Sequence, residues 1–129
     1  SVSQGQGETI LLVDDEQQLL EVTGQLLQEI GYKVTTACNG LQAVEKYEKK
    51  GDVIDIVLMD VVMPRLGGVA AADRIYAINP DARIVFMTGY DKAHETTCEL
   101  ISDWQNVLHK PLEVEPLSRV IRQRLSPKS

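Results

Sequence analysis

The chain alternates between short apolar runs and longer segments in which apolar residues recur every three or four positions. A run that is apolar at every position predicts a strand covered on both faces, which is typical of a parallel sheet between helices. The longer periodic segments predict amphipathic helices. The expected strands are residues 10–13, 32–37, 52–59, 83–87 and 106–109. The expected helices are residues 16–30, 40–51, 69–78, 91–103 and 113–125.

Five strand–helix pairs in this order predict an α/β fold, a doubly wound, mostly parallel open sheet with helices on both faces. In such sheets the functional crevice lies at the carboxyl ends of the strands. Polar side chains stand at four of these ends, namely Asp14, Asp15 and Glu16 at the first, then Asp60, Thr88 and Lys110. We therefore expect these side chains to converge on one edge of the sheet.

Three carboxylates on one edge repel one another. At about 4 Å and an effective dielectric near 20, each like-charged pair costs on the order of 4 kcal/mol. Either one carboxyl group takes up a proton or a cation enters, and hard oxygen ligands favour Mg²⁺. With the metal bound, one carboxylate can act as a nucleophile toward phosphorus, while an ammonium and a hydroxyl group opposite it bind the phosphoryl oxygens. The edge is therefore predicted to be an aspartyl-phosphate site.

Composition narrows the classes of partner. The length of 129 residues fits one domain. Thirteen Lys and Arg against nineteen Asp and Glu give a net charge of −6. This charge opposes nucleic-acid binding, because no basic excess displaces the phosphate counterions. No apolar run approaches the roughly 20 residues of a membrane-spanning helix, so we expect no membrane contact by this domain.

The cysteines and the chain ends carry no further functional signal. Cys38 and Cys98 are too few for a disulfide scaffold and lack the spacing of a zinc site, so they are expected to be reduced thiols in a cytoplasmic protein. Residues 1–7 are polar and glycine-bearing and are expected to be a linker or a remnant of cloning. Residues 8–125 are expected to form the domain, and residues 126–129 a C-terminal tail.

Four fragments of the sequence resemble the response-regulator receiver domain, the phosphoacceptor module of two-component signalling. They are ILLVDDE (10–16), VLMDVVMPRLGG (57–68), VFMTGY (85–90) and LHKP (108–111). Each fragment alone is a weak signal, but four in the right order, each at the carboxyl end of an expected strand, make a specific one. The resemblance covers residues 8–125 and implies the CheY-like, flavodoxin-like fold with strand order 2-1-3-4-5.

The resemblance also implies a role for each acid. Asp60 matches the phosphorylated aspartate, and Asp15 matches the acid that binds the metal directly. Asp14 matches the neighbour that contacts the ion through water. The main-chain carbonyl of Val62, two positions after Asp60, matches the third protein ligand. The implied cofactor is Mg²⁺.

Two further residues match the family's switch. Lys110 matches the lysine that pairs with the phosphoryl group, and Thr88 matches the hydroxyl that moves to bind it. Because Pro111 follows Lys110 where the family often has a cis peptide, we expect a cis Lys110–Pro111 bond.

The sequence departs from the family pattern at one position. Three residues before the lysine, many members have a Tyr or Phe whose ring swings inward with the threonine, but this chain has Val107. We therefore expect the last helix or the loop after Thr88 to carry the signal.

Val62 and Tyr90 flank the phosphoacceptor and are expected to hinder the water that hydrolyses the acyl phosphate. Val62→Asn is therefore expected to change the phosphoryl lifetime.

The resemblance implies partners and a setting. The expected phosphodonor is a sensor histidine kinase or a histidine-phosphotransfer protein, and the domain itself is expected to be a monomer or a weak dimer. The polar leader and GETILLVDDE resemble the join before the C-terminal receiver of a hybrid sensor histidine kinase, which favours that source over a stand-alone regulator. The family implies a bacterial cytoplasm.

Two other functions stay open at this stage. One is a Mg²⁺-dependent phosphatase or phosphotransferase with an aspartyl intermediate; Asp14 and Glu16 have the two-residue spacing of such enzymes, but the expected DxDGT-like continuation is missing. The other is an interaction module that acts without phosphorylation, which the intact acids, threonine and lysine disfavour. As an enzyme, this segment is expected to show at most self-phosphorylation and autodephosphorylation.

Overall fold

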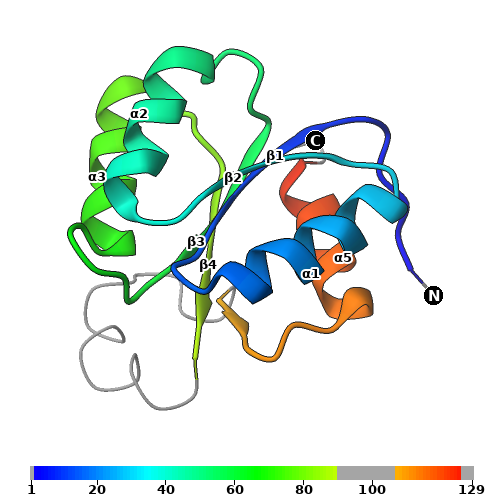
Figure 1. Ribbon diagram of the computed structural model, residues 1–129. Coiled ribbons are helices and arrows are strands. Elements are labelled where there is room, and N and C mark those ends of the chain that lie inside the picture. The colour runs from blue at the N-terminus through cyan, green and yellow to red at the C-terminus, as the bar shows by residue number, and fades with distance from the viewer. Residues whose placement is uncertain (1, 90–106, 126–129) are drawn as a thin grey trace.

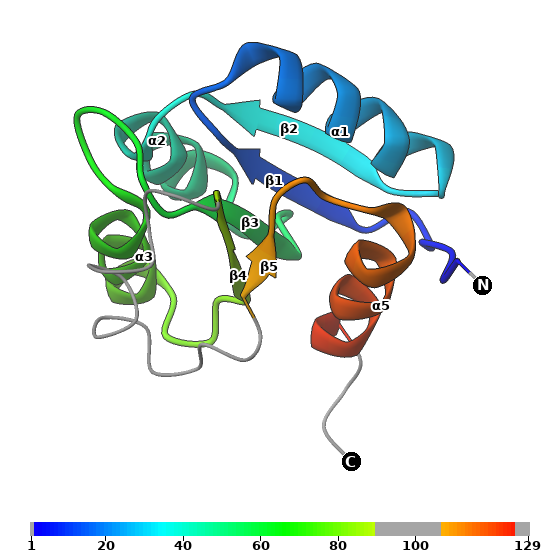
Figure 2. The same ribbon diagram turned by 90° about the horizontal axis from the view of Figure 1, so that it is seen from below.

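The computed structural model describes residues 2–89 and 107–125. They form a five-stranded parallel sheet with strand order β2-β1-β3-β4-β5. Helices α1 and α5 cover one face of the sheet, and α2 and α3 cover the other (Figures 1 and 2). The doubly wound α/β fold and its strand order are therefore confirmed. The helix expected over residues 91–103 lies outside the described residues.

The bounds of the elements follow the hydrophobic pattern closely. The strands are β1 (Thr9–Val13), β2 (Lys33–Ala37), β3 (Ile56–Asp60), β4 (Ile84–Thr88) and β5 (Leu108–His109). The helices are α1 (Gln17–Glu29), α2 (Gly40–Lys50), α3 (Gly68–Ile78) and α5 (Val114–Leu125).

Strand β1 shows why the apolar runs are unbroken. Ile10 and Leu12 point into the core beneath α1 and α5. Leu11 and Val13 point into the core beneath α2 and α3. Because successive side chains of a strand alternate between faces, a sheet that is covered on both faces needs an apolar residue at every position.

The third strand is shorter than its apolar run predicts. It begins at Ile56 rather than at residue 52. The backbone N–H groups of Val53 and Ile54 instead donate to the Lys50 carbonyl, which closes a turn at the end of α2. The Val53 side chain is 56% exposed, so apolar character alone did not place it in the sheet. The fifth strand is also short, since only Leu108–His109 pair with β4.

The register aligns the carboxyl ends of the strands. Val13 pairs with Met59, so Asp14 follows at the level of Asp60. Thr88 pairs with His109, and the Lys110 N–H donates to the Thr88 carbonyl at 2.8 Å. Among the described residues, no helix is both long and apolar enough to cross a membrane.

The segment before β1 packs against the α1–β2 turn. The Gly5 N–H donates to the Ile30 carbonyl at 2.6 Å, and the Gly7 N–H donates to the Gly31 carbonyl at 2.8 Å. A Cβ added to Gly5 would lie 2.9 Å from the carbonyl carbon and oxygen of Gly31. The two backbones therefore approach so closely that Gly5 leaves room where a side chain would not.

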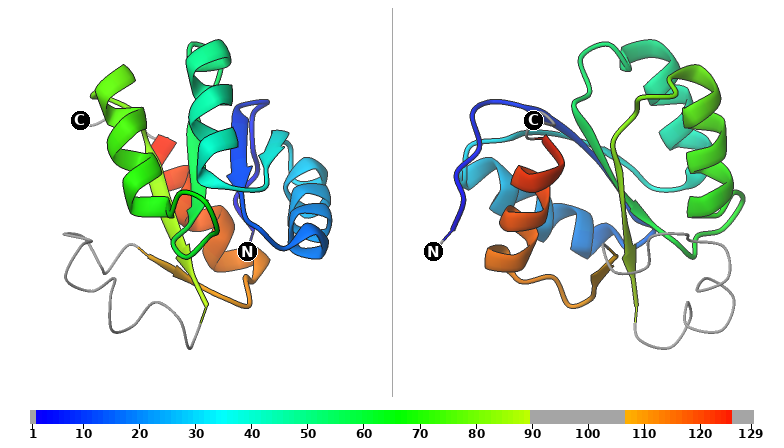
Figure 3. Two further views of the ribbon diagram at one scale, coloured as in Figure 1. Left: turned by 60° about the vertical axis from the view of Figure 1, so that its left-hand side comes forward. Right: turned by 180° about the vertical axis from the view of Figure 1, so that it is seen from behind.

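The same segment also contacts α5. The Ser3 N–H donates to the Ser118 hydroxyl at 3.2 Å, and the carboxylate of Glu8 pairs with the Arg122 guanidinium at 2.6 Å. Figures 1 and 3 show this segment, in dark blue, beside the α1–β2 connection and near α5. Segment 2–8 thus ties α5 to the end of α1. A linker can also pack in this way, so the linker role of residues 1–7 stays a prediction.

Deleting residues 1–7 should destabilise the domain, because the carbonyl groups of Ile30 and Gly31 and the Ser118 hydroxyl lose their hydrogen-bond donors and the packing of the partly buried Val2 is lost. Each hydrogen bond contributes about 0.5 to 1.5 kcal/mol net, so we expect the loss of the three bonds to lower the free energy of unfolding by about 1.5 to 4.5 kcal/mol. Urea unfolding of the shortened and complete chains measures the difference. Equal unfolding free energies would show that these contacts do not stabilise the fold.

Candidate metal and phosphoacceptor site

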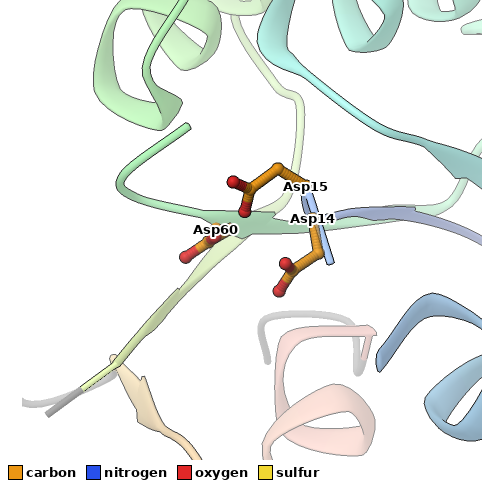
Figure 4. Close-up of side chains that lie close together, drawn as sticks. All are labelled: Asp14, Asp15 and Asp60. Atoms are coloured by element: carbon orange, nitrogen blue, oxygen red, sulfur yellow. The ribbon is translucent and has the colours of Figure 1, made fainter. Parts of the chain in front are cut away.

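Three carboxylates meet where β1 and β3 end. Asp14 and Asp15 follow the last residue of β1, and Asp60 is the last residue of β3. Figure 4 shows the three side chains gathered at these neighbouring strand ends. One oxygen of each carboxylate lies within 4.8 Å of the others. Asp14 is fully buried and Asp60 is 5% exposed, while Asp15 is open to solvent.

Lys110 brings a positive charge into this cluster. Its Nζ lies 2.6 Å from Asp14 Oδ2 and 3.4 Å from Asp60 Oδ2. The side chain follows β5, where the Lys110–Pro111 peptide bond is cis, as the sequence analysis expects. The lysine is therefore closer to the buried Asp14 than to Asp60.

Glu16, the third acid after β1, also lies at this cluster, as its position at the end of the strand predicts. Its Oε1 lies 3.9 Å from Lys110 Nζ, and its backbone N–H donates to Asp14 Oδ1 at 2.9 Å. The Glu16 side chain is exposed, so its attraction to the lysine is weakened by water.

Burial and mutual repulsion govern the acidity of the carboxyl groups. Burial, and then the charge of Asp14, raise the pKa of Asp60 from 3.8 to about 6, against the opposing effect of Lys110. Burial also raises the pKa of Asp14, although Lys110 opposes this shift. Burial lowers the pKa of Lys110, but the hydrogen bond to Asp14 and the charge of Asp60 outweigh it, so the net shift is upward.

The donor set fits a hard divalent cation. Carboxylate oxygens at this spacing are ligands that Mg²⁺ prefers. One ammonium group does not balance the negative charge of Asp14, Asp15 and Asp60 together. A cation among them would remove the repulsion that, after burial, raises the Asp60 pKa.

Val62 lies in the loop between β3 and α3, two residues beyond Asp60, with 40% of its side chain exposed. Its expected role rests on its main-chain carbonyl, so its side chain is free to face solvent. Tyr90, the other expected flanking residue, lies outside the described residues.

Thr88 ends β4 on the same edge and is buried. Its hydroxyl donates to the neighbouring Gly89 carbonyl at 3.2 Å. Asp60 pairs with Met87, so Thr88 is one residue beyond the level of the phosphoacceptor candidate. To bind a group on Asp60, the hydroxyl must leave Gly89.

Val107 packs inward rather than lying on the surface. It is buried against Val61, with Val69 and Phe86 packed beside this pair. The side chain thus fills space between β5 and the start of the β3–α3 loop. It has no ring that can alternate between a buried and an exposed position.

The metal-free protein should become less stable as the pH rises through about 6. Asp60 holds its proton more tightly when folded than when unfolded, so its stabilising contribution is complete below pH 3.8 and is lost as the pH passes its folded pKa of about 6. Asp60→Asn should remove this dependence and, at about pH 8 in chelator, stabilise the domain by on the order of 1 to 3 kcal/mol.

Urea unfolding of both proteins at about pH 5 and about pH 8 measures this effect. The difference in unfolding free energy between the two proteins should grow with pH. A difference that does not change with pH would contradict the raised pKa.

Comparison with known proteins agrees with this geometry. The response regulator receiver domain family matches residues 10–122. The chemotaxis protein CheY of Treponema pallidum is 32% identical over 105 residues, which are 81% of this chain and 73% of that protein. The sensor kinase CckA of Brucella abortus is 32% identical over 118 residues, which are 91% of this chain but 12% of that protein. The chain likewise spans 27% of the transcriptional regulatory protein ZraR of Klebsiella oxytoca, at 34% identity.

Solved structures show the same likeness. The response regulator TrrA of Thermotoga maritima, in complex with Mg²⁺ and BeF, is 30% identical, covers 92% of this chain and 99% of its own, and has a TM-score of 0.77. A response regulator receiver domain protein of Clostridium thermocellum is 26% identical, covers 92% of this chain and 94% of its own, and has a TM-score of 0.79. The chain therefore belongs to the response-regulator receiver domains of two-component signalling.

Proposed function

We propose that Asp60 accepts a phosphoryl group from a phosphohistidine of a sensor histidine kinase or a histidine-phosphotransfer protein. Asp15, Asp60 and the main-chain carbonyl of Val62 would hold Mg²⁺ directly, and Asp14 would hold it through water. The observation that carries this proposal is the cluster of three carboxylates within 4.8 Å of one another, with Lys110 beside them.

Receiver domains bind Mg²⁺ at an acidic pocket, and this chain has an acidic cluster at the matching strand ends. When bound, the ion neutralises the carboxylates and the phosphoryl oxygens, which lowers the cost of bringing two anions together. The residues of this chain supply the nucleophile, its orientation and the remaining positive charge.

The transfer itself needs one new bond. An Asp60 carboxylate oxygen attacks phosphorus, the phosphorus–nitrogen bond to the donor histidine breaks, and its electron pair stays on the imidazole, which then takes up a proton. Asp60 is held for this attack at the end of β3, with little solvent to compete. The Lys110 ammonium lies 3.4 Å from the carboxylate and can pair with the negative charge of the phosphoryl oxygens once the group is transferred.

Lys110 and Thr88 would both change partners on phosphorylation. A cation beside Asp14 weakens the hold of that carboxylate on Lys110, which frees the ammonium for the phosphoryl group. The Thr88 hydroxyl would leave the Gly89 carbonyl for a phosphoryl oxygen. Since Val107 has no ring to move with Thr88, α5 or the loop after Thr88 would pass on the change.

The setting is proposed from the relatives. Similarity to a region of the sensor kinase CckA supports a source in a hybrid sensor histidine kinase, with a cytoplasmic location. Within this segment the chemistry would be limited to self-phosphorylation and autodephosphorylation. A phosphatase and a phosphorylation-independent binding module are outcomes that the next experiment separates.

Incubation with acetyl phosphate and Mg²⁺ should add one phosphoryl group to the wild-type chain and none to Asp60→Asn, as read by intact mass. Asp52→Asn, which changes an exposed acid in the α2–β3 turn, is the matched control and should be modified like the wild type. Modification of Asp60→Asn at the wild-type rate would contradict the assignment. A chain that is never modified would be a binding module, and steady release of phosphate from added monoesters would indicate a phosphatase.

Val62→Asn should shorten the lifetime of the phosphorylated chain severalfold. Val62 lies two residues beyond Asp60 and is exposed, and an amide in place of its apolar side chain can hydrogen-bond the attacking water. Loss of the added mass after removal of acetyl phosphate measures the rate. Val53→Asn, at another exposed valine, should leave it unchanged. An unchanged rate in Val62→Asn would remove this explanation.

A further inference from the structure

The first turn of α2 touches the loop that carries Val62. Gly40, the first residue of α2, is buried against Leu66 in the loop between β3 and α3. A Cβ on Gly40 would overlap the Leu66 carbonyl oxygen and lie 2.9 Å from its Cβ and 3.0 Å from its carbonyl carbon. The contact involves main-chain atoms, so a rotamer change of Leu66 would not relieve it.

The helix side of this contact is held firmly. The Asn39 side chain caps α2 by accepting from the Gln42 N–H at 2.9 Å. The Gln42 side chain in turn accepts from the Cys38 N–H at 3.0 Å. These reciprocal hydrogen bonds fix the first turn of α2, so it does not retreat easily from Leu66.

Hydrogen bonds also restrain the loop side of this contact. The Gly68 N–H donates to the Val61 carbonyl at 2.8 Å, which joins the two ends of the loop. Inside the loop, the Leu66 N–H donates to the Pro64 carbonyl at 2.8 Å, and Arg65 has a positive φ of 69°. The Leu66 side chain packs against the core beneath α2 and α3. A displacement of Leu66 therefore moves the short loop as a unit, including Val62.

We propose that Gly40 is a positioning residue for the metal site. Because Gly40 has no side chain, the start of α2 lies directly against the β3–α3 loop. This contact sets the position of the Val62 carbonyl relative to Asp60. This inference rests on the proposed role of that carbonyl as a ligand. It adds a residue from a third element, α2, to a site built at the ends of β1 and β3.

Gly40→Ala tests the inference, with Gly24→Ala in α1 as the matched control. A Cβ on Gly24 would meet only a Val34 methyl group at 3.6 Å, an ordinary contact. In chelator, amide NMR shifts of Gly40→Ala should change mainly in residues 61–67. In titrations with Mg²⁺, its dissociation constant should rise about tenfold, while Gly24→Ala stays at the wild-type value. Acetyl phosphate modification should recover at saturating Mg²⁺, because the nucleophile itself is unchanged.

A second variant tests the inference even if Gly40→Ala does not fold. Asn39→Ala removes the cap without adding atoms, so it should loosen the first turn of α2 and weaken its contact with Leu66. It should therefore raise the Mg²⁺ dissociation constant by a smaller factor than Gly40→Ala does. If the folded variants bind Mg²⁺ as the wild type does, or if the shifts spread over the whole domain, Gly40 is not a positioning residue. If the wild type itself shows no Mg²⁺-dependent shifts, the proposed function fails instead, and the metal-free shifts still decide whether Gly40 positions the loop.

Discussion

Repulsion among carboxylates that the fold forces together is the constraint on which the rest of this site depends. Strands β1 and β3 are neighbours in register, so Asp14, Asp15 and Asp60 meet at one edge whatever their charges prefer. The backbone hydrogen bonds of a buried parallel sheet hold them there. Burial raises the pKa of Asp60 most, the charge of Asp14 raises it further, and a cation would relieve this repulsion without a proton.

Lys110 relieves only part of this repulsion. It lies nearest the buried Asp14, at 2.6 Å, and leaves Asp60 less well compensated at 3.4 Å. The phosphoacceptor candidate therefore keeps a nucleophilic oxygen that is not fully neutralised, and the exposed Asp15 leaves an open side for an ion. The same arrangement links metal binding to the position of the lysine, because a cation near Asp14 competes with the ammonium group.

The sequence predicted the fold and the gathered side chains because both follow from local rules. Apolar residues at every position mark buried parallel strands, and parallel strands bring their carboxyl ends to one edge. The prediction failed where hydrogen bonds that the periodic pattern does not encode decide the structure. The turn that closes on Lys50 delays β3, and the packing of segment 2–8 on α5 leaves no periodic signal. The contact between Gly40 and Leu66 joins the start of α2 to the β3–α3 loop, which only the folded chain brings together.

We propose that these carboxylates are best accommodated with a divalent ion among them. The most direct measurement is the free energy of unfolding at neutral pH as a function of Mg²⁺ concentration at constant ionic strength. A ligand that binds only the folded state stabilises it in proportion to the logarithm of its concentration above the dissociation constant. We expect such a rise for the wild-type chain. An unfolding free energy that does not depend on Mg²⁺ would contradict it.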